Sequence, residues 1–186
     1  MHSYIDTSAF KDGDIIFTSI PNRLYQSVEQ ATASPVSHVG ILFNINGEWF
    51  VAESKVPFSC YTPLEQFIAR SKDRWFSVKR VSPTLSQKHL VLLKNFCDQR
   101  MGKLYHFGFK YKSKRQFCSK FVYDAYTISL GIEVGKLQTF RELLAANPKA
   151  SRTFWRCWFL GFIPWNRVTI SPSSQYADER LAFISN

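Results

Sequence analysis

Residues 115–126 read RQFCSKFVYDAY and place Cys118 at the start of a predicted amphipathic helix. Apolar side chains recur along it at spacings of three and four residues, which is the period of one helix face. They are Phe121, Val122, Ala125 and Ile128. Gly131 directly follows Leu130 and predicts the end of the helix there.

A cysteine in the first turn of a helix lies near the positive end of the helix dipole and near unpaired backbone N–H groups. Both features favour the thiolate, which is the nucleophilic form of the side chain. Lys114, Arg115 and Lys120 add positive charge around Cys118 and act in the same direction. The alternative is that Cys118 is a small core residue, as most free cysteines are.

The composition indicates a chain that can form one full hydrophobic core. It has 186 residues, of which 45% are hydrophobic, so we expect a single domain over residues 1–186. The formal net charge of +10 favours contact with polyanions, either nucleic acid or an anionic membrane surface. Lysine and arginine are scattered, however, without a long basic run or a recognisable nucleic-acid motif. The charge therefore predicts at most a weak contact with an anionic membrane surface.

The four cysteines, at positions 60, 97, 118 and 157, form no C-x-x-C pair. This spacing argues against a zinc site and against a redox dithiol, so the sequence predicts no metal and no cofactor. Residues 1–6 lack the basic and apolar regions of a signal peptide. The longest apolar run, residues 154–165, is shorter than the roughly 20 residues that span a bilayer. We therefore expect a cytoplasmic protein with free thiols.

Periodicity and turn signals predict an α+β domain whose strands are mainly antiparallel. The predicted strands are residues 14–17, 37–43, 48–54, 75–81, 167–170 and 181–184. The predicted helices are residues 22–34, 62–70, 84–101 and 118–130, and one that begins at residue 139 and ends before Pro148. Two of these helices open with a Thr-x-x-Glu capping box, at Thr62 and at Thr139.

Asn46-Gly47 between two predicted strands is the strongest short hairpin signal in the sequence. With a two-residue loop, His38 lies diagonal to Glu53 on the neighbouring strand. With a four-residue loop that begins at Asn44, His38 lies directly opposite Glu53. In both registers the two Cβ atoms are roughly 5 to 8 Å apart on the same face. A loop of odd length would put them on opposite faces.

Cys118, His38 and Glu53 together are the groups that nucleophilic catalysis by a thiol requires. A histidine takes the thiol proton and returns it to the leaving group, and a carboxylate beside it fixes its tautomer. His2 lies in the N-terminal tail and His89 opens a polar helical turn, where both are expected to be solvated, so His38 and His106 remain as candidates. His38 is the one that the hairpin places beside a carboxylate. The ordinary alternatives are a satisfied core histidine and a charge at the rim of a sheet.

Four short segments occur in the order histidine, acid, cysteine, whereas ordinary papain-like enzymes place the cysteine first. They are SHVGI at residues 37–41, VAES at 51–54, YHFG at 105–108 and FCSKFV at 117–122. In these segments the chain resembles the permuted papain-like amidases of the NlpC superfamily, in the YiiX/YebB-like branch, over nearly its whole length. The resemblance implies a circularly permuted papain-like fold, with a mainly antiparallel sheet packed against helices.

The resemblance also implies roles for individual residues. Cys118 would be the nucleophile, His38 its base and Glu53 the residue that orients the imidazole. Tyr105 matches an aromatic position near the thiol, where its hydroxyl would help to hold the site or the substrate; the alternative is a core aromatic. No role follows for His106. Backbone N–H groups at the start of the Cys118 helix would stabilise the oxyanion of a tetrahedral intermediate.

Three functions remain open at this point. The favoured one is a cysteine amidase or peptidase-like hydrolase that cleaves an amide bond in a peptide, lipid or other N-acyl substrate. The second is a lipid acyltransferase or thioesterase-like enzyme with the same residues, and the third is a catalytically idle module that binds an anionic surface. Residues 154–165, with Arg152, Arg156 and Arg167 nearby, form a wall for an acyl chain, dock on an anionic membrane or complete the core.

Overall fold

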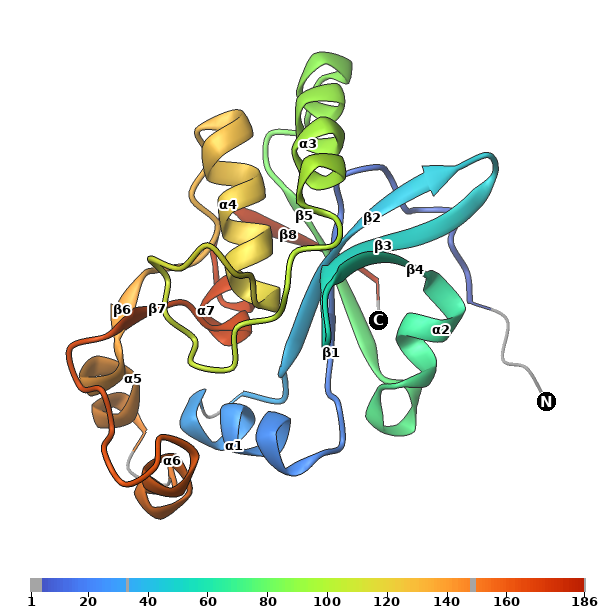
Figure 1. Ribbon diagram of the computed structural model, residues 1–186. Coiled ribbons are helices and arrows are strands. Elements are labelled where there is room, and N and C mark those ends of the chain that lie inside the picture. The colour runs from blue at the N-terminus through green and yellow to red at the C-terminus, as the bar shows by residue number, and fades with distance from the viewer. Residues whose placement is uncertain (1–4, 33, 148–149, 186) are drawn as a thin grey trace.

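The computed structural model describes residues 5–32, 34–147 and 150–185, and its centre is a six-stranded antiparallel sheet (Figure 1). In spatial order the strands are β4 (Ser59–Pro63), β3 (Glu48–Ser54), β2 (His38–Ile45), β1 (Ile15–Thr18), β5 (Phe76–Val81) and β8 (Leu181–Ser185). A short second sheet pairs β6 (Gln138–Thr139) with β7 (Val168–Thr169). The predicted α+β class with antiparallel strands is confirmed, and the structure adds β4 and β6 to the predicted strands.

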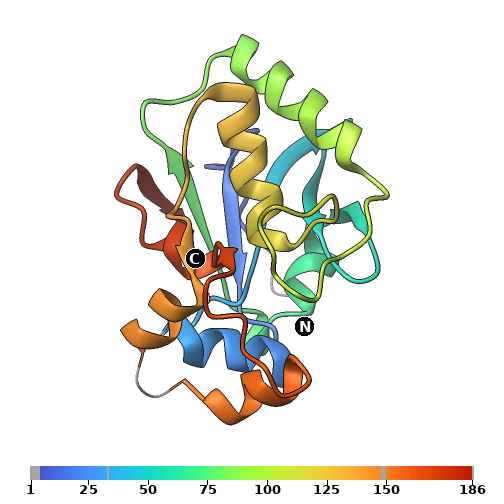
Figure 2. The ribbon, with the colours of Figure 1, turned by 60° about the vertical axis from the view of Figure 1, so that its left-hand side comes forward.

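Helices cover both faces of the large sheet and one of its ends, where α1, α5 and α6 gather (Figure 2). The helices are α1 (Arg23–Thr32), α2 (Leu64–Ala69), α3 (Gln87–Arg100), α4 (Cys118–Leu130), α5 (Phe140–Ala146), α6 (Arg152–Trp158) and α7 (Pro172–Tyr176), with a 3-10 turn η1 (Lys72–Arg74). The sequence prediction contains α1 to α5 and omits α6, α7 and η1.

The side chains of the sheet alternate between two cores, because successive residues of a strand point to opposite faces. Ile15 and Phe17 of β1 pack in the core that contains residues of α3 and α4, such as Leu93 and Phe121. Ile16 of β1 packs in the other core, together with residues of α2. Burial of each such side chain contributes roughly 1.5–3 kcal/mol, so the two cores hold the sheet between the helices.

A third core lies at the end of the sheet, away from the strands. Its aromatic side chains come from α5 and α6 and from the residues just before α4, and they include Phe117, Phe140 and Trp155. Several of its rings meet edge to face, as Phe140 and Trp155 do with centroids 5.5 Å apart. This core surrounds the first turn of α4 and accounts for part of the high aromatic content of the chain.

The β2–β3 hairpin has the two-residue loop, which is the first of the two predicted registers. Ile45 pairs with Glu48 across the Asn46-Gly47 turn. His38 therefore lies diagonal to Glu53, on the same face of the sheet. Asn46 and Gly47 both have positive φ angles, as this tight turn requires.

Gly40 lies across from Glu53 in this register and leaves room between the two strands. A Cβ atom built on Gly40 would lie 2.3 Å from Cγ1 of Val51 and 3.4 Å from Cβ of Glu53. Any other residue at position 40 would have to displace β3. The glycine therefore allows the close approach of the two strands that carry His38 and Glu53.

The prediction that a helix starts with a capping box at Thr62 is wrong. Thr62 and Pro63 belong to β4, and α2 begins only at Leu64, without a side-chain cap. The Thr62 hydroxyl donates instead to Oε1 of Glu53, because β4 holds it on the face of the sheet that carries this carboxylate. The capping box at Thr139 is confirmed at the start of α5.

Helix α4 is more deeply buried than an amphipathic pattern predicts. Residues 118–126 are all buried, since helices, sheet and loop surround the first half of α4. Ile128, which the pattern assigns to the buried face, is 61% exposed, so that assignment is wrong. Gly131 ends the helix as predicted, in a left-handed conformation with φ of 69°.

The apolar run at residues 154–165 divides into buried and exposed parts. Its first part belongs to α6, where Trp155 is buried in the third core. Leu160 and Phe162 follow in a turn and are 96% and 80% exposed. None of the helices in the described residues is long and apolar enough to span a membrane.

Candidate active site

Cys118 is the first residue of α4, as the sequence predicts. Phe117 before it has an extended backbone and makes no side-chain cap, so the N–H groups of the first turn have no partner from this N-cap. The Cys118 side chain is buried except for a small exposed fraction of 4%. It lies on the wall of a cavity.

His38 and Glu53 are in direct contact, as the hairpin predicts. Nε2 of His38 lies 2.5 Å from Oε2 of Glu53, and both side chains are fully buried. The imidazole packs against the ring of Phe67 from α2, with ring centroids 5.5 Å apart. His38 is the first residue of β2, so its ring lies at the end of the sheet, where the start of α4 reaches it.

The carboxylate of Glu53 has further partners that sequence reasoning missed, of which Thr62 is buried and Arg70 and Lys55 are partly exposed. Its Oε1 accepts hydrogen bonds of 2.6 Å from the Thr62 hydroxyl and from Nη2 of Arg70, and Lys55 lies 3.9 Å away. Burial alone would raise the pKa of Glu53, but the hydrogen bond and charge of His38, with those of Arg70, hold this pKa well below its ordinary value. We call His38, Glu53, Thr62 and Arg70 the polar cluster.

Cys118 lies beside His38, and the two side chains interact. Burial alone would lower the pKa of His38. The interactions with Cys118 and with the Glu53 carboxylate outweigh burial, so the pKa of His38 is raised. Because Glu53 occupies Nε2, Nδ1 is the ring nitrogen that remains for the thiol. The structure thus brings together the three predicted residues in the order thiol, imidazole, carboxylate.

Of the predicted basic residues around the thiol, Lys120 does not act as a free charge. It is buried and paired with Asp124 one turn along α4. Lys114 and Arg115 lie exposed before the helix. Local positive charge at Cys118 therefore comes from the imidazole and the helix start more than from lysine.

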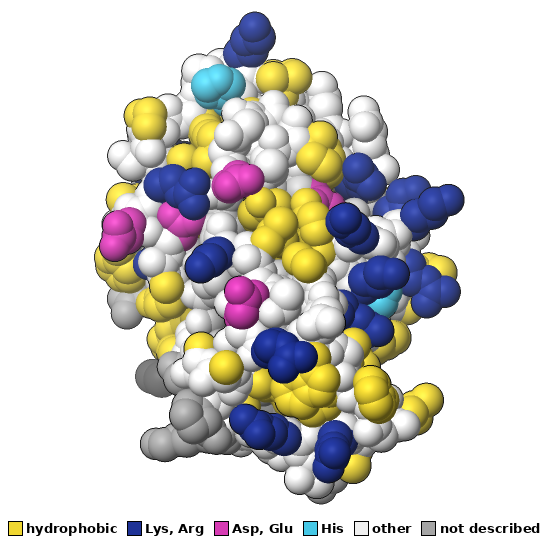
Figure 3. Space-filling view, turned by 90° about the vertical axis from the view of Figure 1, so that its left-hand side faces the viewer, with side chains coloured by type: hydrophobic (Ala, Val, Ile, Leu, Met, Phe, Trp, Pro, Cys, Tyr) yellow, Lys and Arg dark blue, Asp and Glu magenta, His cyan; other side chains and the backbone are white. Residues whose placement is uncertain are grey.

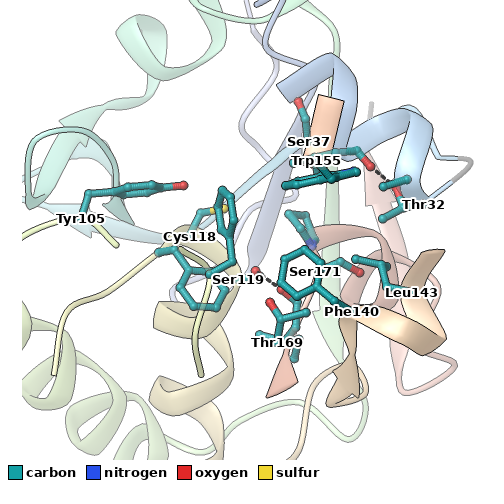
Figure 4. A pocket seen from close by; sticks show the side chains of 16 residues that line it. Thr32, Ser37, Tyr105, Cys118, Ser119, Phe140, Leu143, Trp155, Thr169 and Ser171 are labelled. Atoms are coloured by element: carbon teal, nitrogen blue, oxygen red, sulfur yellow. Dashed lines mark hydrogen bonds between the residues drawn. The ribbon is translucent and has the colours of Figure 1, made fainter. Parts of the chain in front are cut away.

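Cys118 opens into an apolar cavity between α4, α1, α5 and α6 (Figure 4). The cavity is narrow, and the centres of water-sized molecules can occupy only about 30 Å³ of it. Tyr105 lies on its wall, with its hydroxyl group on the side of Cys118, and is buried. Tyr105 is thus both a core aromatic and a neighbour of the thiol. We call this space the apolar cavity.

The other histidines lie apart from this pair. His89 is exposed on α3, as expected, and His2 lies outside the described residues. His106 is half-buried, and its Nδ1 accepts a hydrogen bond from the backbone N–H of Gly108. It therefore holds the turn of its own loop.

Alternation along β4 could have revealed Thr62, because Glu53 pairs with Cys60 and Thr62 is the next residue on the same face. Arg70 follows the last residue of α2, and no pattern in the sequence indicates where its side chain points. Gln116 was also missed: it is fully buried, and its amide has no hydrogen-bond partner among the described residues. The sequence gives no signal for that environment.

Among residues 5–32, 34–147 and 150–185, no group of three or more His, Cys, Asp and Glu side chains is arranged to hold an ion. The thiols at positions 60, 97, 118 and 157 are free.

Comparison with known proteins identifies relatives over nearly the whole chain. The chain is 30% identical over 173 residues to the uncharacterized protein YiiX of Escherichia coli strain K12, with 93% of this chain and 85% of that protein covered. A crystal structure described as metalloprotein yiiX from Escherichia coli O157:H7 superposes with a TM-score of 0.89 at 30% identity, over 96% of this chain and 98% of that one.

The family comparison gives a consistent result. Residues 9–185 match the model of the permuted papain-like amidase enzymes, YaeF/YiiX, C92 family. The match covers the sheet, the polar cluster and Cys118. The predicted permuted papain-like fold is thereby confirmed, and the chain belongs to the C92 family of permuted papain-like amidases.

Proposed function

We propose that the protein hydrolyses an amide bond, with Cys118 as nucleophile, His38 as acid and base, and Glu53 as the residue that orients His38. The observation that carries this proposal is the buried row of Cys118, His38 and Glu53, in which Glu53 contacts Nε2 of His38 and the sulfur lies on a cavity wall. Each group has the neighbour that its role requires.

In the first half of the reaction, His38 holds the proton of the thiol and the thiolate attacks the carbonyl carbon of the amide. The C=O π electrons move to oxygen, and the N–H groups of the first turn of α4 stabilise the oxyanion. When the carbonyl re-forms, the C–N bond breaks and the amine leaves with the proton from the imidazolium. The acyl group remains on Cys118 as a thioester.

In the second half, water attacks the thioester carbon while neutral His38 takes one of its protons. Collapse of this second intermediate breaks the C–S bond and releases a carboxylic acid, and Cys118 recovers its starting state. The net reaction adds one water to the amide and gives an acid and an amine. No other reactant is needed.

The polar cluster supports both halves of the reaction. Glu53 accepts from Nε2 and keeps Nδ1 directed at the sulfur, and its negative charge stabilises the imidazolium. Thr62 and Arg70 hold the other oxygen of the carboxylate, which keeps it ionised and fixed. Tyr105 supports the site from the cavity wall.

The test is selective alkylation by iodoacetamide at pH 7, followed by mass spectrometry of each cysteine. We expect Cys118 to react at least about tenfold faster than the other thiols, because only a paired thiolate combines charge with access. The advantage should disappear in His38→Asn. With an alkanoyl 7-amino-4-methylcoumarin amide as substrate, Cys118→Ala should lower kcat/KM by roughly 10³ or more.

The other cysteines are controls in the same chain. Cys157 is exposed, so it reports the rate of an accessible thiol, and Cys97 is buried, with a pKa that burial raises far above its ordinary value. Equal alkylation of Cys118 and Cys157, together with equal amide hydrolysis by Cys118→Ala, would show that Cys118 is a packing residue and not a nucleophile.

A further inference from the structure

Ser119, the residue after the proposed nucleophile, is held at two points by residues 170–175, which lead from β7 into α7. Its hydroxyl donates a hydrogen bond of 2.8 Å to the carbonyl of Ile170. Its own carbonyl accepts a hydrogen bond of 3.0 Å from Nε2 of Gln175. Both Ser119 and Gln175 are buried, so water does not compete for these bonds. The two bonds fix the Ser119 peptide against the start of α7.

The side chain of Gln175 is built into this position. Its Nε2 also donates to the carbonyl of Val134 at 3.3 Å, so both N–H groups of the amide bind backbone oxygens. Gly135 leaves the room for it, since a Cβ atom at position 135 would lie 2.7 Å from Cγ of Gln175. Oε1 of Gln175 is buried and has no partner in the part of the chain that the structure describes. The fold therefore keeps the two donors in place even though the amide oxygen loses its hydration.

The backbone of Ser119 takes part in the proposed reaction. Cys118 and Ser119 are the first two residues of α4, and the N–H groups of a first turn have no acceptor inside the helix. In the proposed function these N–H groups stabilise the oxyanion. A donor that moves by a fraction of an ångström loses much of this stabilisation, because the hydrogen bond depends on distance and angle. Whatever holds the Ser119 peptide thus affects the rate.

This hold on Ser119 is separate from the other parts of the site. Gln175 belongs to α7, whereas the polar cluster comes from β2, β3, β4 and the end of α2. Gln175 is also absent from the described residues that line the apolar cavity. A substitution at position 175 should therefore change neither the charge on the Cys118 sulfur nor the space beside it, and should act on the oxyanion alone.

We propose that Gln175 is a positioning residue, which holds the Ser119 peptide so that the backbone N–H of Ser119 points at the oxyanion. The bond from the Ser119 hydroxyl to Ile170 is a second hold on the same peptide. The inference rests on the proposed function and adds a residue to it. Both halves of the reaction pass through an oxyanion, so Gln175 should affect kcat whichever half is slower.

Two reactions of Cys118 in the full-length protein distinguish this role from a purely structural one. In alkylation by iodoacetamide the sulfur bonds to the CH2 carbon and iodide leaves, and no oxyanion forms. Hydrolysis of the alkanoyl coumarin amide forms an oxyanion twice. Gln175→Met keeps the length of the side chain and removes both donors. We expect its kcat to fall by about tenfold to hundredfold, while KM and the alkylation rate stay within about twofold.

Butanal gives the same comparison without turnover, so it decides even if the coumarin amide is a poor substrate. The sulfur of Cys118 bonds to the aldehyde carbon, and the aldehyde oxygen takes the proton from the His38 imidazolium to give a neutral hemithioacetal. This oxygen then occupies the place of the oxyanion. Butanal should protect Cys118 from iodoacetamide in the unchanged protein, and its dissociation constant should rise at least about fivefold in Gln175→Met.

Ser119→Ala tests the second hold, because it removes the hydroxyl that donates to Ile170. We expect kcat to fall by about threefold to tenfold, again without a change in the alkylation rate of Cys118. This variant decides if Gln175→Met does not fold.

Ser174→Ala is the matched control on α7. The Ser174 hydroxyl donates to the carbonyl of Ser171 and accepts from the N–H of Lys136. Its loss therefore loosens α7 without removing either bond to Ser119. The kcat of this variant should stay within about twofold of the unchanged protein.

The inference is overturned if Gln175→Met has the same kcat as Ser174→Ala, because Gln175 then contributes only to packing. It is also overturned if the alkylation rate of Gln175→Met falls as much as its kcat, because Gln175 then acts on the thiol. Failure of the proposed function is a different result. In that case Cys118 of the unchanged protein is alkylated no faster than Cys157, and butanal does not protect it.

Discussion

Cys118 lies between two regions of opposite character. On the side of the large sheet, charged and polar side chains contact one another in the polar cluster. On the side of α1, α5 and α6, apolar side chains line the apolar cavity. In the polar cluster both oxygens of Glu53 have hydrogen-bond donors, including Arg70. In the apolar cavity the hydroxyls of Thr32 and Ser119 donate to backbone carbonyls, and the Trp155 N–H has no acceptor among the described residues.

The difference teaches that reaction chemistry and substrate selection lie on separate elements. The polar cluster comes from β2, β3, β4 and the end of α2, and the apolar cavity comes mainly from α1, α5, α6 and the segment before α4. The two meet at Cys118. Substitutions in the polar cluster should therefore change rates and pH dependence, while substitutions in the apolar cavity should change the space beside the thiol.

The largest effect is expected for Glu53→Gln, which keeps the size of the side chain and removes its charge. The pKa of His38 should fall, because the hydrogen bond to the Glu53 carboxylate and its negative charge no longer raise it. Hydrolysis of an alkanoyl coumarin amide should drop by roughly 10² or more. Titration of the His38 ring by NMR, together with kcat/KM, measures both consequences.

The same variant should lose stability in a defined pH window. The lowered pKa of Glu53 stabilises the fold above 4.5, and this contribution is lost as pH falls through the folded value. The raised pKa of His38 stabilises the fold below 6.5, and this contribution is lost as pH rises through the folded value. Urea unfolding measures the difference in the free energy of unfolding between Glu53→Gln and the unchanged protein. This difference should be largest between pH 4.5 and pH 6.5.

A smaller effect is expected for Arg70→Met, which leaves the His38–Glu53 contact in place. Loss of the guanidinium removes one donor and one positive charge from Glu53, so the pKa of this carboxyl should rise. We expect kcat/KM to fall by about three- to tenfold, with a larger loss at pH 5 than at pH 8. Arg74→Met is the matched control, since Arg74 pairs with exposed Glu65. An equal loss of kcat/KM in Arg70→Met and Arg74→Met would show that Arg70 does not support the reaction through Glu53.

The smallest effect concerns the surface beyond the apolar cavity. Figure 3 shows apolar side chains among Lys and Arg on the face that carries α5 and α6, and exposed Leu160 and Phe162 follow α6. Arg156 is exposed there, whereas Arg167 donates to the carbonyl of Gly108 and is not free to dock. The predicted membrane contact therefore depends on few groups.

Vesicles of phosphatidylserine and phosphatidylcholine test that contact at low salt. Sedimentation with the vesicles should weaken about fivefold in the double variant Leu160→Ser/Phe162→Ser and should be lost at high salt. Val91→Ser is the control, because Val91 is 49% exposed on α3. If the unchanged protein does not sediment with the vesicles, or if Val91→Ser loses as much binding as the double variant, the predicted membrane contact is wrong.

The sheet side could be predicted from the sequence because its geometry is local. The Asn46-Gly47 turn and strict alternation limit the relation of His38 to Glu53 to two registers, and one of them is observed. The same reasoning failed at Thr62, where a capping pattern and a strand ending compete for the same residues. Hydrogen bonding to a carboxylate on the neighbouring strand, which no local pattern contains, decides in favour of the strand.

The helix side could not be predicted because it assembles distant segments. Ala31 and Trp155 meet across more than a hundred residues, and no short-range signal encodes that contact. Helix α6 did have a signal, since the Ser151 side chain caps it at the N–H of Phe154. The many apolar residues after Ser151 favoured a membrane contact as one interpretation of this segment, and the helix was not predicted.

The buried amide of Gln116 and the indole N–H of Trp155 have a practical consequence. A buried polar group without a partner costs about 1–3 kcal/mol, so any molecule that pairs with either group recovers that free energy in addition to its own contacts. In a chain of this size, each kcal/mol raises the melting temperature by about 2–4 °C. A thermal-shift screen of neutral amides and acids would thus find molecules that this fold accommodates before any turnover is detected.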